Sequence, residues 1–158
     1  MREPRPGELK YGRIVQVDPE NGRTVAVHRT PDEGGVHGVL WADNALWMTC
    51  FKWKTIARVD PKTFKVTHQF PLKYTRPHGL AWDPPGMWVG YSNDYVFLKQ
   101  DIQDGKVLEE IKLEKEKDPD PHGMDMYQGK LYYTDAGISP GAKESGSKYS
   151  GYICRIDL

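Results

Sequence analysis

The sequence has little of what several large classes of protein require. Its 22 Lys and Arg residues are balanced by 22 Asp and Glu residues, so the formal net charge is zero. Nucleic acids and anionic membranes attract proteins with a basic surplus, and we therefore expect neither as a partner. No apolar run approaches the roughly 20 residues that a membrane-spanning helix needs.

Signals for secretion and for cysteine chemistry are also lacking. The first six residues are charged and proline-rich with no apolar stretch behind them, so no signal peptide is visible and we expect a cytoplasmic protein. The two cysteines, Cys50 and Cys154, form neither a disulfide framework nor a metal-ligand spacing. The sequence has no P-loop, dinucleotide fingerprint or nucleophile elbow, and therefore it indicates no reaction.

Aromatic residues and turn formers are abundant instead. The chain has 4 Phe, 5 Trp and 9 Tyr among 158 residues, beside 16 Gly and 12 Pro. No segment keeps a 3.6-residue apolar period, and the charged run at 112–117 ends at Asp118-Pro119. This combination is typical of many short strands joined by tight turns.

An internal repeat organises these strands. A His-Gly pair followed by an apolar run begins at His37, His78 and His122, that is, at intervals of 41 and 44 residues. Each pair is followed by a second apolar run, and further strands meet at turns that begin with Asp, such as Asp60-Pro61. Four short strands about every 40 residues are typical of a β-propeller blade. Phe64 stands where the matching turns have glycine, so we expect that turn to be strained or of another type.

The sequence therefore predicts an all-β fold, a β-propeller of four-stranded antiparallel blades. We expect an N-terminal loop at 1–10 and a partial propeller at 11–158, with blade pieces 11–36, 37–77, 78–121 and 122–158. These pieces hold two, four, four and three expected strands, or about three and a quarter blades.

Such an arc does not close into a ring, because propellers usually have four to eight blades. Exposed faces of the end blades would forgo on the order of 10 kcal/mol of burial. Either the chain lacks N-terminal blades of a longer protein, or a homodimer completes the ring. The segment before Tyr152 is similar to the one before Tyr11, and this favours the first alternative.

On these repeats, the chain from about Tyr11 to Leu158 resembles the group of propellers that includes NHL-repeat proteins, regucalcin-like lactonases and virginiamycin B lyase. The resemblance implies the fold and leaves the chemistry open.

The three repeated histidines are the best candidates for a site. His37, His78 and His122 each open the innermost strand of a blade, where they would line the central channel at one mouth. Three neutral imidazoles on one arc are a plausible ligand set for a divalent metal such as zinc. The propeller lyase domain that cleaves peptidyl-α-hydroxyglycine holds zinc by histidines in similar Pro-His contexts, and the resemblance implies the same role here. Alternatively, the histidines are structural, like the repeated Gly-His pair of WD-repeat propellers.

Other candidates break the repeat. Asp125 replaces the apolar Leu40 and Ala81 of the sibling repeats, and we predict that it is a metal ligand or general base and so the catalytic residue. Four residues of two loops are predicted to form an aromatic rim that binds a small molecule: Trp53, Tyr91, Asn93 and Tyr95. The Gly/Ser-rich connection 136–148 is expected to be mobile.

The remaining aromatic and histidine residues receive simpler interpretations. Four tryptophans recur in register and are predicted to lie in the core between blades: Trp41, Trp47, Trp82 and Trp88. His28 and His68 are predicted to be surface residues of outermost strands.

Three functions stay open at this stage. The first is a module that binds a small ligand or metal at a His-lined central channel. The second is a metal-dependent lyase or hydrolase of the propeller type. The third is a protein-interaction scaffold that uses the loop face.

Overall fold

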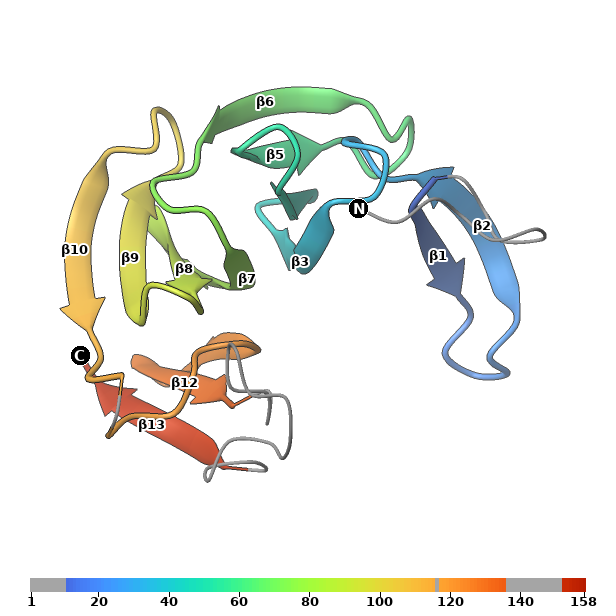
Figure 1. The fold of residues 1–158 in the computed structure, drawn as a ribbon. Coiled ribbons are helices and arrows are strands. Elements are labelled where there is room, and N and C mark those ends of the chain that lie inside the picture. Colours follow the sequence, from blue (N-terminus) through green and yellow to red (C-terminus); the bar gives the residue numbers. More distant parts are fainter. Residues whose placement is uncertain (1–10, 116, 136–151) are drawn as a thin grey trace.

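The computed structural model describes residues 11–115, 117–135 and 152–158. The expected N-terminal loop at 1–10 and the connection 136–148 lie outside these residues. Within the described ranges every regular element is a strand, and the strands form four antiparallel sheets (Figure 1). The predicted all-β fold is therefore confirmed. None of the described residues forms a helix that is long and apolar enough to span a membrane.

Consecutive strands pair with each other inside each sheet. The first sheet contains β1 (Arg13–Val17) and β2 (Thr24–Arg29). The second sheet contains β3 (Val36–Ala42), β4 (Ala45–Cys50), β5 (Thr55–Val59) and β6 (Val66–Pro71). The third contains β7 (Pro77–Asp83), β8 (Gly86–Tyr91), β9 (Val96–Asp101) and β10 (Val107–Lys112). The fourth contains β11 (Met124–Tyr127), β12 (Lys130–Thr134) and β13 (Ile153–Asp157).

The sheets follow one another along an arc, with β3 and β7 on its inner side and β6 and β10 on its outer side (Figure 1). The central strand of this arrangement is β7, which contacts both β3 and β11. The first strands of three successive sheets therefore lie side by side. Whatever stands at the start of these strands is brought together by the fold.

The turns that join the third and fourth strands share one geometry. In each turn a backbone N–H donates to the carbonyl oxygen of the aspartate four residues earlier, over 2.8–2.9 Å. The donors are Gly22, Phe64 and Gly105. Gly22 and Gly105 take left-handed φ angles of 71° and 73° there, and Phe64 takes 57°. Phe64 thus adopts the same turn as its siblings at a conformational cost, and its ring stacks on His28 at 4.1 Å.

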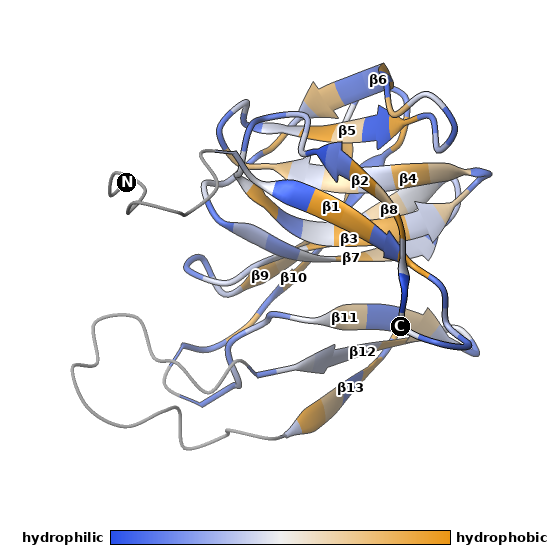
Figure 2. Cartoon of the chain, turned by 90° about the vertical axis from the view of Figure 1, so that its right-hand side faces the viewer, coloured by the Kyte–Doolittle hydropathy of each residue, from blue (hydrophilic) through white to orange (hydrophobic). Residues whose placement is uncertain are grey.

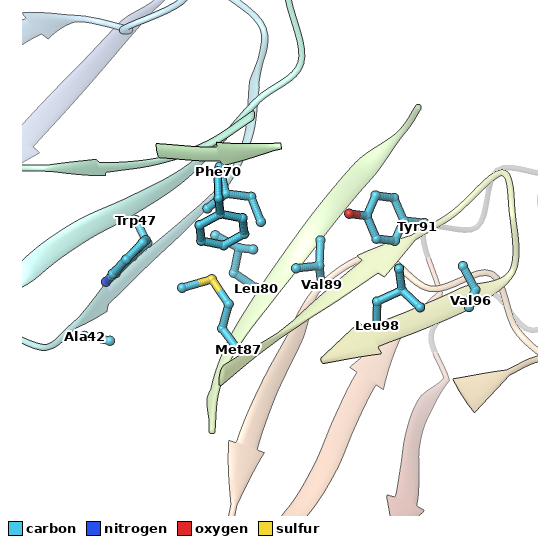
Figure 3. Close-up of a cluster of buried hydrophobic side chains, with 10 residues drawn as sticks. Ala42, Trp47, Phe70, Leu80, Met87, Val89, Tyr91, Val96 and Leu98 are labelled. Carbon is cyan, nitrogen blue, oxygen red and sulfur yellow. The ribbon is translucent and has the colours of Figure 1, made fainter. Parts of the chain in front are cut away.

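Apolar side chains fill the spaces between sheets. Trp47 and Phe70 of the second sheet pack against Met87 and Val89 of the third (Figure 3). Trp88 of the third sheet belongs to a second cluster with the fourth sheet. The predicted core position of both tryptophans is confirmed, since each is at most 1% exposed.

Trp41 and the two outer histidines depart from expectation. Trp41 is 58% exposed, because among the described residues the first sheet has no inner strand to cover that part of β3. His28 and His68 are half-buried rather than superficial. His28 stacks on Phe64, and the His68 Nε2 atom lies 3.0 Å from the Ile102 carbonyl oxygen.

The free faces at the two ends of the arc differ in character. Strand alternation places four exposed valines on the outer face of the first sheet, which is turned toward the viewer in Figure 2: Val15, Val17, Val25 and Val27. The outer face of the fourth sheet carries Asp157, which pairs with Lys130 and Arg155. The valine face also carries Arg13 and Arg29, and the face of Asp157 also exposes Tyr127 and Ile153.

Candidate functional site

The three repeated histidines meet where β3, β7 and β11 come together. The ring centroids of His37 and His78 are 4.8 Å apart, and those of His78 and His122 are 4.0 Å apart. The glycine after each histidine permits this approach. A Cβ atom on Gly38 would overlap the carbonyl oxygen of His78, and one on Gly79 would overlap that of His122. The structure therefore brings the three repeated histidines next to one another, as the repeat predicted.

These segments enclose a cavity of about 340 Å³, lined by residues 37–39, 78–80 and 122–124. We call it the histidine cavity. Three successive sheets contribute equivalent triplets, from the start of β3 and β7 and from the residues that lead into β11, so the cavity is a direct product of the repeat.

Few of the imidazole nitrogens have hydrogen-bond partners. Arg76 donates through Nε to Nε2 of His78 at 3.1 Å, and through Nη1 to Oδ1 of Asn93 at 3.3 Å. Within the described residues the ring of His37 makes no hydrogen bond, and the buried Nδ1 atom of His122 has none either. His37 is exposed, so its ring nitrogens face solvent. Buried polar atoms are normally hydrogen-bonded, so the open Nδ1 atom of His122 needs an explanation.

A buried carboxyl group lies beside His122. Asp120 is 3% exposed, and its Oδ2 atom lies 3.6 Å from the His122 Nδ1 atom. The Asp120 backbone N–H donates to Oδ2 of Asp135 at 2.8 Å, whereas Asp120 Oδ1 is buried without a partner. The unpaired oxygen and the unpaired nitrogen thus lie on neighbouring groups.

Sequence reasoning missed Arg76 and Asp120, although a signal existed. Both stand two residues before a repeated histidine, and Gly35 is the matching residue in the second sheet. The histidines repeat, but the residue at this position differs in all three sheets. A binding site in a repeat protein can be built in this way, with repeated residues as the framework and non-repeated neighbours that give it specificity.

The imidazoles are uncharged at neutral pH. Burial lowers the pKa of His37 and of His122, and the Arg76 guanidinium lowers both further. Burial, the other two imidazoles and Arg76 together lower the pKa of His78 to about 3. A neutral imidazole offers one hydrogen-bond donor and one acceptor. The cluster can therefore both donate to a ligand and accept from it.

The pKa of Asp120 shifts in the opposite direction to that of the histidines. Burial and the negative charge of Asp135 raise the pKa of Asp120 to about 7. Near neutral pH this group is divided between carboxylic acid and carboxylate, so it can hold or release a proton next to His122.

As the side chains lie, the cluster does not form a metal-ligand set. Among the described residues, no group of three or more His, Cys, Asp or Glu side chains is arranged to hold a metal ion. The Nε2 lone pair of His78 already accepts from Arg76, a fixed positive charge that disfavours a cation. The zinc site at these histidines therefore stays a prediction, and we derive no chemistry through it.

Asp125 lies away from the cavity. It alternates along β11 with Met124, which lines the cavity, so its own side chain is on the opposite face and is exposed. Its Oδ1 atom accepts from the Met126 backbone N–H at 2.8 Å. The carboxyl group that the fold brings to the histidines is Asp120, and a catalytic role for Asp125 has no support from this placement.

The predicted aromatic rim is divided by burial. Tyr91 and Tyr95 lie in the core, and the Tyr91 hydroxyl donates to Oε1 of Gln100 at 2.7 Å. Trp53 and Asn93 are exposed on the turns after β4 and β8. Tyr91 ends a strand whose side chains are buried on both faces, which the pattern of residues did not indicate. Two of the four predicted rim residues are therefore core residues.

No protein-family model and no curated protein sequence matches the chain. Solved structures do. Hydrazine synthase of Kuenenia stuttgartiensis matches with a TM-score of 0.56 at 20% identity, over 78% of this chain and 32% of that chain. Glutaminyl cyclase of Myxococcus xanthus matches with a TM-score of 0.63 at 13% identity, over 79% and 60%. A luciferin-regenerating enzyme matches with a TM-score of 0.60 at 18% identity, over 82% and 47%.

The chain thus spans between about a third and 60% of the length of these three structures. Identities this low establish the fold alone. The three matched proteins have propeller-type folds, and so has this chain.

Proposed function

We propose that the chain is part of a β-propeller module that binds a small polar ligand in the histidine cavity. The observation that carries the proposal is the meeting of three uncharged imidazoles from three successive sheets with most of their ring nitrogens unbonded. One of these nitrogens, Nδ1 of His122, is buried, and an unpaired buried nitrogen is costly unless a group from outside the chain pairs with it.

The chemistry of the wall suggests the kind of ligand. Neutral imidazoles donate and accept hydrogen bonds, and Arg76 adds a positive charge beside His78. A ligand with several hydroxyl, carbonyl or carboxyl oxygens would match these groups. Because Asp120 is half protonated near neutral pH, it would tune the hydrogen bonding of His122 to such a ligand.

The narrower features of the fold remain our interpretation. They are membership of the NHL-repeat, regucalcin-like and virginiamycin B lyase group, a content of about three and a quarter blades, and completion of the ring by further blades or by a second copy. The repeated His-Gly pairs and the exposed valines on the outer face of the first sheet support them. Solution mass tests the last point, because a ring completed by two copies requires twice the 18.1 kDa of the chain.

Imidazole NMR tests the ligand proposal. We expect compounds from a panel of small sugars, hydroxy acids and amino acids to shift the ring resonances of His37, His78 and His122 together, and the shifts to vanish in a His37→Ala/His122→Ala variant. His28 is the internal control, since it lies outside the cavity. A panel in which no compound moves the three rings, with the double variant changing only stability, would overturn the proposal.

One observation favours the metal-dependent alternative, namely that Asp120 Oδ1 and His122 Nδ1 are buried without partners. Metal analysis of protein purified without a His tag decides it. Stoichiometric zinc that is lost in a His78→Ala/His122→Ala variant would favour a metal-dependent lyase or hydrolase over simple ligand binding.

A further inference from the structure

A second cavity lies between the second and third sheets, and it shares no residue with the histidine cavity. Its volume is about 280 Å³, and six residues line it: Asp43, Trp47, Arg58, His68, Ile102 and Gln103. It combines an aromatic side chain, an arginine with its aspartate partner, one aliphatic side chain and two further hydrogen-bonding side chains. We call it the tryptophan cavity.

Trp47 has a hydrogen-bond donor with nothing to receive it. Its side chain is 1% exposed, and its Nε1 atom is buried with no partner among the described residues. An indole N–H is a donor only, so it needs an acceptor. The guanidinium of Arg58 lies over the same ring, 6.0 Å from its centroid.

The third sheet contains the same arrangement with its acceptor in place. Trp88 pairs with Lys99 across β8 and β9, as Trp47 pairs with Arg58 across β4 and β5. Trp88 donates through Nε1 to Oδ2 of Asp83 at 3.0 Å, and the Lys99 ammonium lies 2.7 Å from the same oxygen. The Lys99 ammonium also lies 6.0 Å from the Trp88 ring centroid. One carboxylate thus serves an indole and a cation together.

In the second sheet no carboxylate serves both the indole and the cation. Asp83 is the last residue of β7, and Ala42 is the last residue of β3. Figure 3 shows the nitrogen of Trp47 at the end of the indole nearest Ala42. Arg58 turns instead to the neighbouring Asp43, with Nη2 3.1 Å from its carbonyl oxygen and 3.4 Å from Oδ2, in an exposed contact. The Asp43 carboxylate thus pairs with the arginine alone, and no described group accepts from the indole N–H.

We infer that the tryptophan cavity binds a small-molecule carboxylate. A carboxylate oxygen of the ligand accepts from Trp47 Nε1 and pairs with Arg58, as Asp83 does with Trp88 and Lys99. The short remainder of the ligand lies along Ile102, where His68 is held by its contact with the Ile102 carbonyl oxygen. The choice of a carboxylate rests on the sibling sheet, where a carboxylate serves an indole and a cation in the same arrangement.

Indole NMR of the full chain tests the inference. We expect sodium propionate to shift the Nε1–H resonance of Trp47, identified by its loss in Trp47→Phe, in a saturable manner. Propionamide, which has the same shape without the charge, should not shift it. The Trp88 resonance is the internal control, because its acceptor is already present.

Ala42→Asp supplies the carboxylate from the chain itself. We expect it to move the Trp47 resonance toward that of Trp88, to raise the Tm and to weaken the propionate response at least tenfold. Arg58→Gln should also weaken the response about tenfold, since a hydrogen bond to a charged group is lost. Arg58 is partly exposed, so this second variant tests the site even if Ala42→Asp does not fold.

Three results would overturn the inference. They are a Trp47 resonance that propionate leaves in place, an equal response to propionamide, and a response that Ala42→Asp or Arg58→Gln leaves unchanged. None of these results bears on the histidine cavity, which contains neither Trp47 nor Arg58.

Discussion

The second and third sheets are two versions of one four-stranded unit, and they differ where each has a polar group to satisfy. Trp47 and Trp88 occupy the same position, each with a cation 6.0 Å from its ring. The third sheet pairs its indole with Asp83, whereas the second sheet has alanine there and leaves its indole open. The apolar framework is shared, and the polar groups decide which sheet is closed and which can receive a ligand.

The histidine cavity follows the same rule. The second, third and fourth sheets each contribute a His-Gly pair, but among the described residues only the His78 imidazole of the third sheet accepts a hydrogen bond from an arginine. Function, in this interpretation, is found where a repeat departs from its siblings.

The largest effect is expected from breaking the close backbone contact between the first strand of one sheet and the histidine of the next, a contact made by a glycine in both the second and the third sheet. Gly79→Ala would force a Cβ atom into the His122 carbonyl oxygen and the Met124 side chain, and Gly38→Ala into the His78 carbonyl oxygen. We expect each variant to lose about 3 kcal/mol of unfolding free energy in urea titrations, because backbone cannot yield as a side chain can.

Gly123→Ala is the matched control. Its added Cβ atom would meet only the Thr134 hydroxyl, at 2.9 Å, which can rotate away. A loss at Gly123 as large as that at Gly79 would mean that close packing of the first strands is not what these glycines provide.

The next effect comes from making the third sheet resemble the second. Asp83→Ala leaves the Trp88 N–H without an acceptor and the Lys99 ammonium without its closest partner. We expect a loss of about 2 kcal/mol, measured by urea unfolding, since a buried donor becomes unsatisfied. If the variant is as stable as the parent, then the indole N–H of Trp47 needs no acceptor either.

The hairpin turns give a smaller contrast. Gly105 has a φ of 73° and lies against the Phe70 ring, so Gly105→Ala should lower the unfolding free energy by about 1–2 kcal/mol. Phe64→Gly relieves the strained φ of 57° but removes the stacking on His28, and we expect a net change below about 1 kcal/mol. Thermal unfolding of both variants checks the order. A larger effect at Phe64 would show that stacking outweighs backbone strain.

The last contrast is in the pH dependence of stability, and it is absent at neutral pH and develops only as the pH falls. The pKa of His78 is lowered to about 3, so the unfolded chain binds a proton that the folded chain refuses. This contribution is complete above the ordinary pKa of 6.5 and is lost as the pH falls from 6.5 toward 3. His78→Gln should flatten the unfolding free energy across that window. His37 is more exposed, so His37→Gln should flatten it less.

Equal slopes in the two glutamine variants would contradict the ranking of burial. Asp120→Asn provides a check of opposite sign. Its raised pKa makes the folded chain bind the extra proton, so its contribution is lost as the pH rises from 3.8 toward 7, and the variant should remove that loss.

The repeat made the strands and the meeting of the histidines predictable, because equivalent positions of a repeat occupy equivalent places in space. His37, His78 and His122 could be placed together before any coordinates were known. Tyr91 and Tyr95 could not be placed, since whether a residue at a strand end is buried depends on how the following turn folds. Asp120 was overlooked because a carboxyl group between two prolines looks like an ordinary surface loop.

The tryptophan cavity could not be predicted from the sequence for a related reason. Nothing in the sequence around Trp88 states that Asp83 reaches across the hairpin to its indole. Without that contact the alanine at 42 is an unremarkable small residue, and its importance emerges only when the two sheets are compared in three dimensions.

The sheets follow one another along the arc (Figure 1), and this order has a kinetic consequence. Each sheet packs against its immediate neighbours, and β7 contacts strands on both sides. Opening of an end sheet breaks one interface, while opening of the third breaks two, so local unfolding should begin at the ends and travel inward. Deuterium uptake should therefore reach the amides of β1 and β13 first and those of β8 and β9 last.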